Sequence, residues 1–145
     1  MKDLIAGCEQ FNDNRSTPSV SEKGKTFQLN NNKNKRNVRC IKIDGCVFVA
    51  KDGKKCDYLF EVLDKVYLIE LKGSDVVEGV RQLYQTILKF KKYYNDWTIE
   101  ARLILGNRVP ASIKNAKEYE LLYAEVVKKN GSIIIKNQDL YKEAI

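Results

Sequence analysis

The hydrophobic pattern of this chain changes its period at Gly73, and this change constrains the fold more than any other feature. Before it, residues 38–72 consist of short alternating or apolar runs, which are typical of β-strands separated by turns. After it, apolar residues recur at steps of three and four over 75–95, which predicts one long amphipathic helix. A mostly apolar strand follows at 98–105, and a helix that connects two strands of one sheet normally makes them parallel.

Hairpin-connected strands are expected before this helix. The run VRCIKID begins at Val38, GCVFVA continues as a second apolar run, and Asp52-Gly53 is a tight-turn dipeptide. The runs CDYLFEVL and KVYLIELK flank a polar break at Asp64-Lys65, which predicts a hairpin. Asp75, with Glu78 three residues later, resembles a capping box at the start of the long helix.

The chain of 145 residues has the length of one domain with its own core, so we expect residues 1–145 to form a single domain. Some helix is expected within 1–11, whereas the turn formers and amides of 12–37 predict a mobile or irregular segment. Its asparagine and lysine cluster fits a solvated linker and also a phosphate-contacting loop. A second helix is expected over 113–129, followed by a last strand in SIIIK. The fold class is therefore α/β: a mixed central sheet flanked by helices, with a C-terminal helix and strand.

Composition narrows the partners and the chemistry. The 26 basic and 19 acidic residues give a net charge of +7, which favours a polyanionic partner, although basic residues also serve solubility. The chain has no histidine, so histidine-based triads, general bases and metal ligands are excluded. The four cysteines lack the close spacing of a zinc knuckle, and we expect them to be reduced thiols. No apolar stretch approaches the ~20 residues that cross a bilayer, and the start is too short and polar for a signal peptide, so we expect a cytoplasmic protein without membrane contact.

Three charged residues stand in or beside the strands that we expect to be buried: Asp57, Glu70 and Lys72. Buried charges are costly unless they pair, bind an ion or become neutral. Side chains two residues apart on a strand share a face, so Glu70 and Lys72 share one, and a hairpin turn at Asp64-Lys65 brings Asp57 alongside them. Two adjacent carboxylates suit Mg²⁺, which keeps its waters for a phosphate substrate, and a neighbouring lysine can stabilise charge or position the attacking water.

The stretch CDYLFEVLDKVYLIELK resembles the active-site hairpin of the PD-(D/E)xK phosphodiesterases, the restriction-endonuclease-like superfamily. By position, Asp57 matches the first acid of the motif, Glu70 the second and Lys72 the lysine. The resemblance implies an αβββαβ core and Mg²⁺-dependent hydrolysis of a nucleic-acid phosphodiester, with Asp57 and Glu70 as metal ligands and Mn²⁺ as a substitute ion. The context carries the resemblance, because acid-x-lysine occurs by chance about two or three times in such a composition. The other instance, Asp52-Gly53-Lys54, lies in an expected turn.

Some positions depart from the motif or extend it. Cys56 stands where the motif name has proline. Members of the superfamily often add an acid from the first helix, for which Glu22 is the first candidate and Glu9 the second. Gln82 resembles the helix glutamine of some branches, although the RecB-like tyrosine spacing is missing because position 86 is threonine. A solvent-facing helix residue is the alternative interpretation of Gln82.

The main functional hypothesis is a Mg²⁺-dependent endonuclease that acts on DNA, with RNA as a second possibility and bacterial or phage DNA metabolism, repair or defence as the setting that the resemblance suggests. The chain has no room for a separate recognition domain, so we expect structure-selective or weakly sequence-selective cutting, in which a homodimer could cut two strands. Basic residues near the site are expected to hold the phosphate backbone: Lys42, Lys54, Lys55 and Arg81.

Two alternatives remain open at this stage. Glu70 and Lys72 could form an ordinary same-face ion pair, with Asp57 capping the turn after Lys54-Lys55. The chain could also be a non-catalytic protein on a nuclease-like fold, either a nucleic-acid-binding module or an inhibitory interaction protein.

Overall fold

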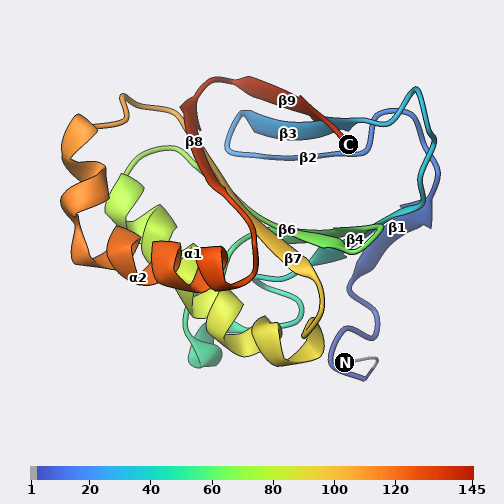
Figure 1. Ribbon diagram of the computed structural model, residues 1–145, viewed down its shortest axis with the longest axis horizontal. Helices are drawn as coiled ribbons and strands as arrows, with labels where there is room; N and C mark the ends of the chain where they lie inside the picture. The colour runs from blue at the N-terminus through green and yellow to red at the C-terminus, as the bar shows by residue number, and fades with distance from the viewer. Residues whose placement is uncertain (1–2) are drawn as a thin grey trace.

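Two β-sheets face each other, and both α-helices cover the outer face of the larger sheet (Figure 1). The computed structural model describes residues 3–145. In spatial order, the larger sheet consists of β1 (Glu9–Asp13), β4 (Val38–Lys42), β5 (Tyr58–Val62), β6 (Lys65–Lys72), β7 (Thr98–Leu105) and β8 (Ile133–Asn137). The smaller sheet consists of β2 (Ser19–Glu22), β3 (Lys25–Asn30) and β9 (Leu140–Ala144). The helices are α1 (Val76–Phe90) and α2 (Lys117–Lys128).

The larger sheet buries apolar side chains on both faces. On one face, α1 and α2 pack on a cluster that includes Leu68 and Leu103. On the other face, the smaller sheet contributes Phe27 to a cluster with Tyr67 and Ile69. Because side chains alternate along a strand, residues of β6 with even numbers face the helices and those with odd numbers face the smaller sheet. This alternation places Glu70 and Lys72 on the helix face.

The predicted α/β class is confirmed, and its central part follows the expected order. β4, β5 and β6 are joined as antiparallel neighbours, α1 crosses over, and β7 pairs in parallel with β6. The strand expected over 98–105 coincides with β7. The long helix is shorter than expected, since α1 ends at Phe90 and a 3₁₀ turn, η2 (Lys91–Tyr93), continues it. The second helix also differs in part, because a 3₁₀ helix, η3 (Ala111–Asn115), precedes α2.

The start of α1 confirms half of the expected capping box. The Asp75 side chain accepts a hydrogen bond of 3.1 Å from the backbone N–H of Glu78. The Glu78 side chain, however, forms an ion pair with Arg81 instead of returning to the cap.

The N-terminal expectations are wrong where the structure describes them. Residues 3–7 form turns and 9–13 form β1, whereas residues 1 and 2 of the expected helix lie outside the described part. β1 pairs with the outer edge of β4 and so satisfies backbone groups that a helix would leave unpaired. The segment 12–37 is also not irregular throughout, because β2 and β3 form an antiparallel hairpin within it.

The smaller sheet explains why part of this polar segment is ordered. Phe27 and Leu29 on β3 are fully buried, and β3 pairs in parallel with β9, with Thr26 opposite Leu140. The partner strand lies near the far end of the sequence, so no local pattern indicates the pairing. The apolar run GCVFVA was expected to be a strand, but it is not one. It forms a turn with an isolated bridge and leads into a 3₁₀ helix, η1 (Ala50–Asp52).

The cysteines do not all remain reduced. Cys8 and Cys46 form a disulfide across 38 residues, whereas Cys40 and Cys56 are free and buried, as expected of core thiols. The bridge ties the segment before β1 to the loop after β4, where Ile5 and Cys8 join the core on the helix face. None of the helices within residues 3–145 is long and apolar enough to span a membrane.

Reduction of this disulfide is expected to destabilise the fold. A cross-link restricts the unfolded chain, so opening a ring of this length should lower the free energy of unfolding by about 2–4 kcal/mol. Urea unfolding with and without dithiothreitol measures the difference. Cys8→Ser is the control: it cannot form the bridge, so dithiothreitol should not change its free energy of unfolding. An unchanged free energy of unfolding of the wild type in dithiothreitol would contradict the expectation.

Candidate functional site

Asp57 and Glu70 lie opposite each other on neighbouring antiparallel strands. The β5–β6 register pairs Tyr58 with Ile69, so the next position outward sets Asp57 against Glu70. Directly opposed side chains have Cβ atoms about 4.5–5.5 Å apart. The Asp57 Oδ2 atom also accepts a hydrogen bond of 2.9 Å from the backbone N–H of Leu71, which fixes this carboxylate beside β6. The hairpin therefore brings the two predicted acids together.

Glu70 is unusual because its buried carboxyl group faces the carboxyl of Asp57 and no hydrogen-bond donor among the described residues. The residue is 1% exposed, and neither Oε1 nor Oε2 has a hydrogen-bond partner among the described residues. Burial, followed by repulsion from Asp57, raises the pKa of Glu70 to about 9, against the attraction of Lys72 and Lys23. Buried polar groups in folded proteins are almost always hydrogen-bonded, so this carboxyl is a candidate for ion binding or catalysis.

The pKa of Asp57 is raised less than that of Glu70, because a hydrogen bond to its carboxylate partly offsets the effect of burial. Burial raises this pKa to about 6, while the hydrogen bond from Leu71 lowers it. Asp57 thus carries its charge at neutral pH more readily than Glu70. The two acids form an unequal pair, in which a cation would favour full ionisation of both.

The alternative of a simple ion pair does not match the structure. Glu70 and Lys72 share a face, but Glu70 forms no ion pair within residues 3–145. Asp57 also does not cap the turn after Lys54-Lys55, because its carboxylate accepts from Leu71 instead. Asp57, Glu70 and Lys72 therefore do not form a mutually neutralising ion pair among the described residues.

The segment before Asp57 is held by α1. The backbone N–H of Cys56 donates to Oγ1 of Thr86 over 2.8 Å, and this hydroxyl in turn donates to the carbonyl of Gln82 over 2.7 Å. Proline has no N–H, so proline at position 56 would lose the first bond. Cysteine at position 56, where the motif name has proline, therefore keeps a hydrogen bond that proline could not form.

Gln82 is not a solvent-facing residue. Its side chain is buried, and its Oε1 atom lacks a partner among the described residues. Gln82 lies one turn before Thr86 on the face of α1 that packs on the sheet. Together with the two oxygens of Glu70, this amide oxygen completes the set of buried, unpartnered side-chain polar atoms found in residues 3–145. All three atoms belong to residues that the sequence placed in the site.

The additional acids do not join the pair directly. Glu22 forms an ion pair of 2.9 Å with Lys42 and accepts from the Tyr58 hydroxyl, although its charge is close enough to raise the pKa of Asp57. Glu9 lies on β1 and pairs with Arg39. Among residues 3–145 there is no group of three or more acids, cysteines or histidines arranged to hold a metal ion.

The predicted phosphate-binding residues divide into free and engaged side chains. Lys55 is buried, and its Nζ donates to the carbonyls of Asp52 and Gly53, so it supports the loop and has no free charge at the surface. Arg81 is ion-paired with Glu78 and Glu118, and Lys42 with Glu22, as described above. Lys54 is exposed and has no acidic partner in the described chain.

Sequence reasoning missed Lys23. This residue occupies the turn between β2 and β3 and lines a cavity of about 500 Å³ beside the acid pair. The other lining residues are Lys54, Lys72, Gly73, Ser74, Asp75 and Glu78. The signal that could have revealed Lys23 is the dipeptide Lys23-Gly24 between two short alternating runs, which is compatible with a hairpin turn.

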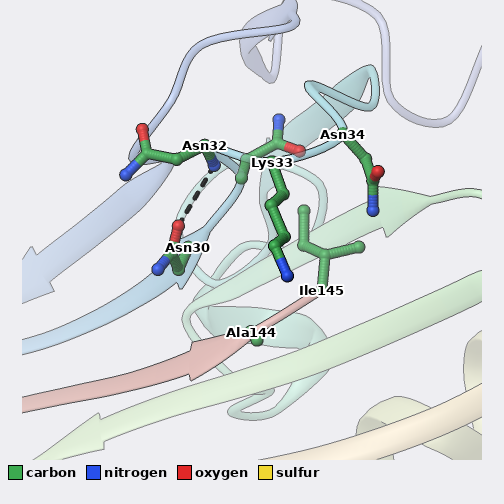
Figure 2. A pocket seen from close by; sticks show the side chains of 7 residues that line it. Asn30, Asn32, Lys33, Asn34, Ala144 and Ile145 are labelled. Atoms are coloured by element: carbon green, nitrogen blue, oxygen red, sulfur yellow. Dashed lines mark hydrogen bonds between the residues drawn. The ribbon is translucent and has the colours of Figure 1, made fainter.

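A second cavity, of about 350 Å³, lies at the asparagine cluster (Figure 2). Figure 2 shows Lys33 extending beside Ile145, while the backbone N–H of Asn32 donates to Oδ1 of Asn30 over 3.1 Å. Buried Asn31 closes the loop through bonds to Arg15 and to both backbone groups of Arg36. The lining of this cavity contains no acidic residue.

The donors at the first site suit a hard divalent cation. Asp57 and Glu70 offer carboxylate oxygens from opposed strands, and both oxygens of Glu70 are unpartnered. Mg²⁺ is commonly held by one or two carboxylates, with waters and substrate phosphates as its remaining ligands. The two acids therefore fit Mg²⁺ without a third acid.

Comparison with protein-family models, curated proteins and solved structures finds no match to this chain.

Glu70 should make the stability of the metal-free protein depend on pH. Its pKa rises from an ordinary 4.5 to about 9, so between these values the folded protein retains a proton that the unfolded chain releases. In EDTA, the free energy of unfolding should fall by up to about 1.4 kcal/mol per pH unit across this window, then level off above pH 9. Glu70→Gln, measured by urea unfolding at several pH values, should remove most of this slope.

Glu120→Gln is a matched control, because Glu120 is exposed on α2. It should preserve the slope of the wild type. An equal slope in Glu70→Gln and wild type would show that Glu70 does not carry a raised pKa.

Proposed function

We propose that the chain is a Mg²⁺-dependent endonuclease that hydrolyses DNA phosphodiester bonds. The observation that carries the proposal is the buried, unpartnered carboxyl of Glu70 opposite Asp57, with Lys72 on the same face. The strand order β4-β5-β6, α1, β7 agrees with the βββαβ part of the core that the resemblance implies.

The chemistry would follow from the positions of these three side chains. Hydrolysis forms a bond between a water oxygen and phosphorus and breaks the bond from phosphorus to one ester oxygen. The water loses a proton and the departing ester oxygen gains one, while negative charge grows on the phosphate oxygens in the transition state. Asp57 and Glu70 would hold Mg²⁺, and the bound ion would supply electrostatic stabilisation of that charge. Lys72 would orient the attacking water and add positive charge beside the phosphate.

Unpaired lysines near the acids would attract the DNA backbone. The net charge of +7 and the free ammonium groups of Lys54 and Lys72 support a polyanionic partner. Because these lysine contacts would go to the phosphate backbone, which carries no sequence information directly, the cutting would be structure-selective or weakly sequence-selective.

The proposal includes action in the cytoplasm, where DNA is available as a substrate. Disulfides are rare in that compartment, so the Cys8–Cys46 bridge would be reduced there. The backbone hydrogen bonds between β1 and β4 would then hold the N-terminal segment in place.

Two observations favour the second candidate, a nucleic-acid-binding protein without catalysis. The described residues contain no group of three metal-ligating side chains, and Glu70 is neutral at neutral pH when no cation is bound. Such a protein would bind DNA with the same salt dependence but would not cleave it. Cleavage therefore separates the two candidates.

The wild-type protein should cleave DNA in Mg²⁺ or Mn²⁺ but not in EDTA. Asp57→Asn, Glu70→Gln and Lys72→Ala should each lower the cleavage rate by a factor on the order of 100–1000, because each removes a group that contacts the metal or the reacting phosphate. Gel assays on linear, nicked, flapped and four-way DNA, with matched RNA, measure the rates and identify the substrate. Glu120→Gln should cleave like the wild type, and failure of the wild type on every substrate would reject the enzyme proposal.

Mg²⁺ should also stabilise the folded protein at pH 8 in the absence of nucleic acid. A ligand that binds only the folded state at 100 times its Kd adds about 2.7 kcal/mol to the free energy of unfolding. Thermal melting over a series of Mg²⁺ concentrations should therefore show a rising Tm for the wild type and for Glu120→Gln. Glu70→Gln should show little rise, and equal shifts in all three proteins would place the ion elsewhere.

A further inference from the structure

The β2–β3 turn extends from the smaller sheet to the acid pair on the larger one. Its two central residues, Lys23 and Gly24, both have positive φ angles, 53° and 73°, as a tight two-residue hairpin turn requires. The register of β2 and β3 ends at Glu22 opposite Lys25, so Lys23 stands at the tip. The tip is exposed, whereas the hairpin behind it is anchored by buried Phe27 and Leu29.

Three lysines from separate parts of the sequence line the cavity at this tip. Lys23 comes from the turn, Lys54 from the loop after η1, and Lys72 from the end of β6. The cavity volume of about 500 Å³ exceeds that of one phosphate group, so it can also admit part of an attached sugar. Neither Asp57 nor Glu70 lines the cavity, but Lys72 follows Glu70 by two residues on the same face of β6, so the cavity adjoins the acid pair.

The lysines of this cavity are uncompensated, whereas its acids are engaged. None of the three lysines forms an ion pair or a side-chain hydrogen bond within residues 3–145. Of the two lining acids, Asp75 caps α1 and Glu78 pairs with Arg81. Three unpaired ammonium groups around one concave surface attract an anion, and a phosphate offers several strong acceptor oxygens.

We propose that this lysine cavity binds a phosphate group of the nucleic-acid strand next to the one that is cut, and that Lys23 is a positioning residue for it. The inference rests on the proposed nuclease function for its substrate. The phosphate can be an internal phosphodiester or a phosphate at a strand end, since both present the same oxygens.

Binding in EDTA tests the cavity without any cleavage. Lys23→Asn removes the charge while keeping a side chain that tolerates a positive φ, so the turn should still form. Fluorescence anisotropy with a labelled DNA oligonucleotide should show a Kd about 5- to 10-fold higher, and the slope of log Kd against log salt should be smaller by about one. Lys23→Arg should bind nearly as the wild type does.

Lys142→Ala is the matched control. Lys142 is exposed on β9 of the same sheet, carries the same charge and does not line the cavity. It should leave the Kd and the salt slope almost unchanged. Equal effects of Lys23→Asn and Lys142→Ala, with both proteins folded by thermal melting, would overturn the proposal.

Two comparisons distinguish the source of the phosphate. If the cavity holds a terminal phosphate, the loss of affinity in Lys23→Asn should occur with a 5′-phosphorylated oligonucleotide and disappear with the same oligonucleotide carrying a 5′-hydroxyl. If it holds an internal phosphodiester, both oligonucleotides should lose affinity equally. Either result supports the site, and no loss with either oligonucleotide rejects it.

Kinetics separate this inference from the nuclease proposal. Lys23 would bind a neighbouring phosphate equally in the ground and transition states, so Lys23→Asn should raise KM and leave kcat unchanged. Lys72→Ala, in contrast, should lower kcat. If the wild type does not cleave but Lys23→Asn still weakens binding, the nuclease proposal fails and the phosphate site stands. If the wild type cleaves and Lys23→Asn changes neither KM nor Kd, the phosphate site fails alone.

Discussion

The burial of one carboxyl group, that of Glu70, determines how the centre of this molecule is organised. Glu70 lies on β6 between β5 and β7, with Leu103 opposite on one side and Asp57 on the other. Desolvation keeps it neutral at neutral pH in the absence of a cation. The same low-dielectric surroundings that disfavour the charge strengthen its attraction to any ion that enters. Under the proposed function, this buried strand position would act as a cation ligand, and the layers packed on both faces of the sheet keep it dry.

Each outer layer contributes something different to this centre. The helix layer fixes the chain just before Asp57, because Oγ1 of Thr86 accepts a hydrogen bond from the backbone N–H of Cys56. The smaller sheet carries Lys23 to the mouth of the site. The acids themselves come from the hairpin of the central sheet. The site is therefore built from three layers, and the central hairpin alone would lack the complete lysine cavity.

The sequence predicted the central elements well because their signals are local. Alternation over β5 and β6 and a period of three to four over α1 are visible within single windows, and they place Asp57, Glu70 and Lys72 correctly relative to one another. The smaller sheet escaped prediction because β3 pairs with β9 near the opposite end of the chain. The Cys8–Cys46 bridge escaped for the same reason, since its spacing resembles no motif.

Charge alone also could not distinguish neighbouring lysines. Lys54 and Lys55 are adjacent in the sequence, yet one is exposed at the cavity and the other donates to two backbone carbonyls. The difference depends on the course of the loop after η1, which periodicity does not encode. Gln82 illustrates the same limit, since only packing against the sheet shows that its amide is buried.

The parallel pairing of β3 with β9 has a consequence for the order of assembly. During synthesis, the strands of the central sheet and α1 leave the ribosome well before residues 140–144. Contacts between segments so far apart in the sequence require closure of a long loop, which is slow compared with forming a hairpin. The acid pair can thus form on the growing chain while the lysine turn still lacks its supporting strand. The lysine cavity is then complete only after residues 140–144 have been synthesised, and a shorter nascent chain would carry the acid pair without the supported lysine turn beside it.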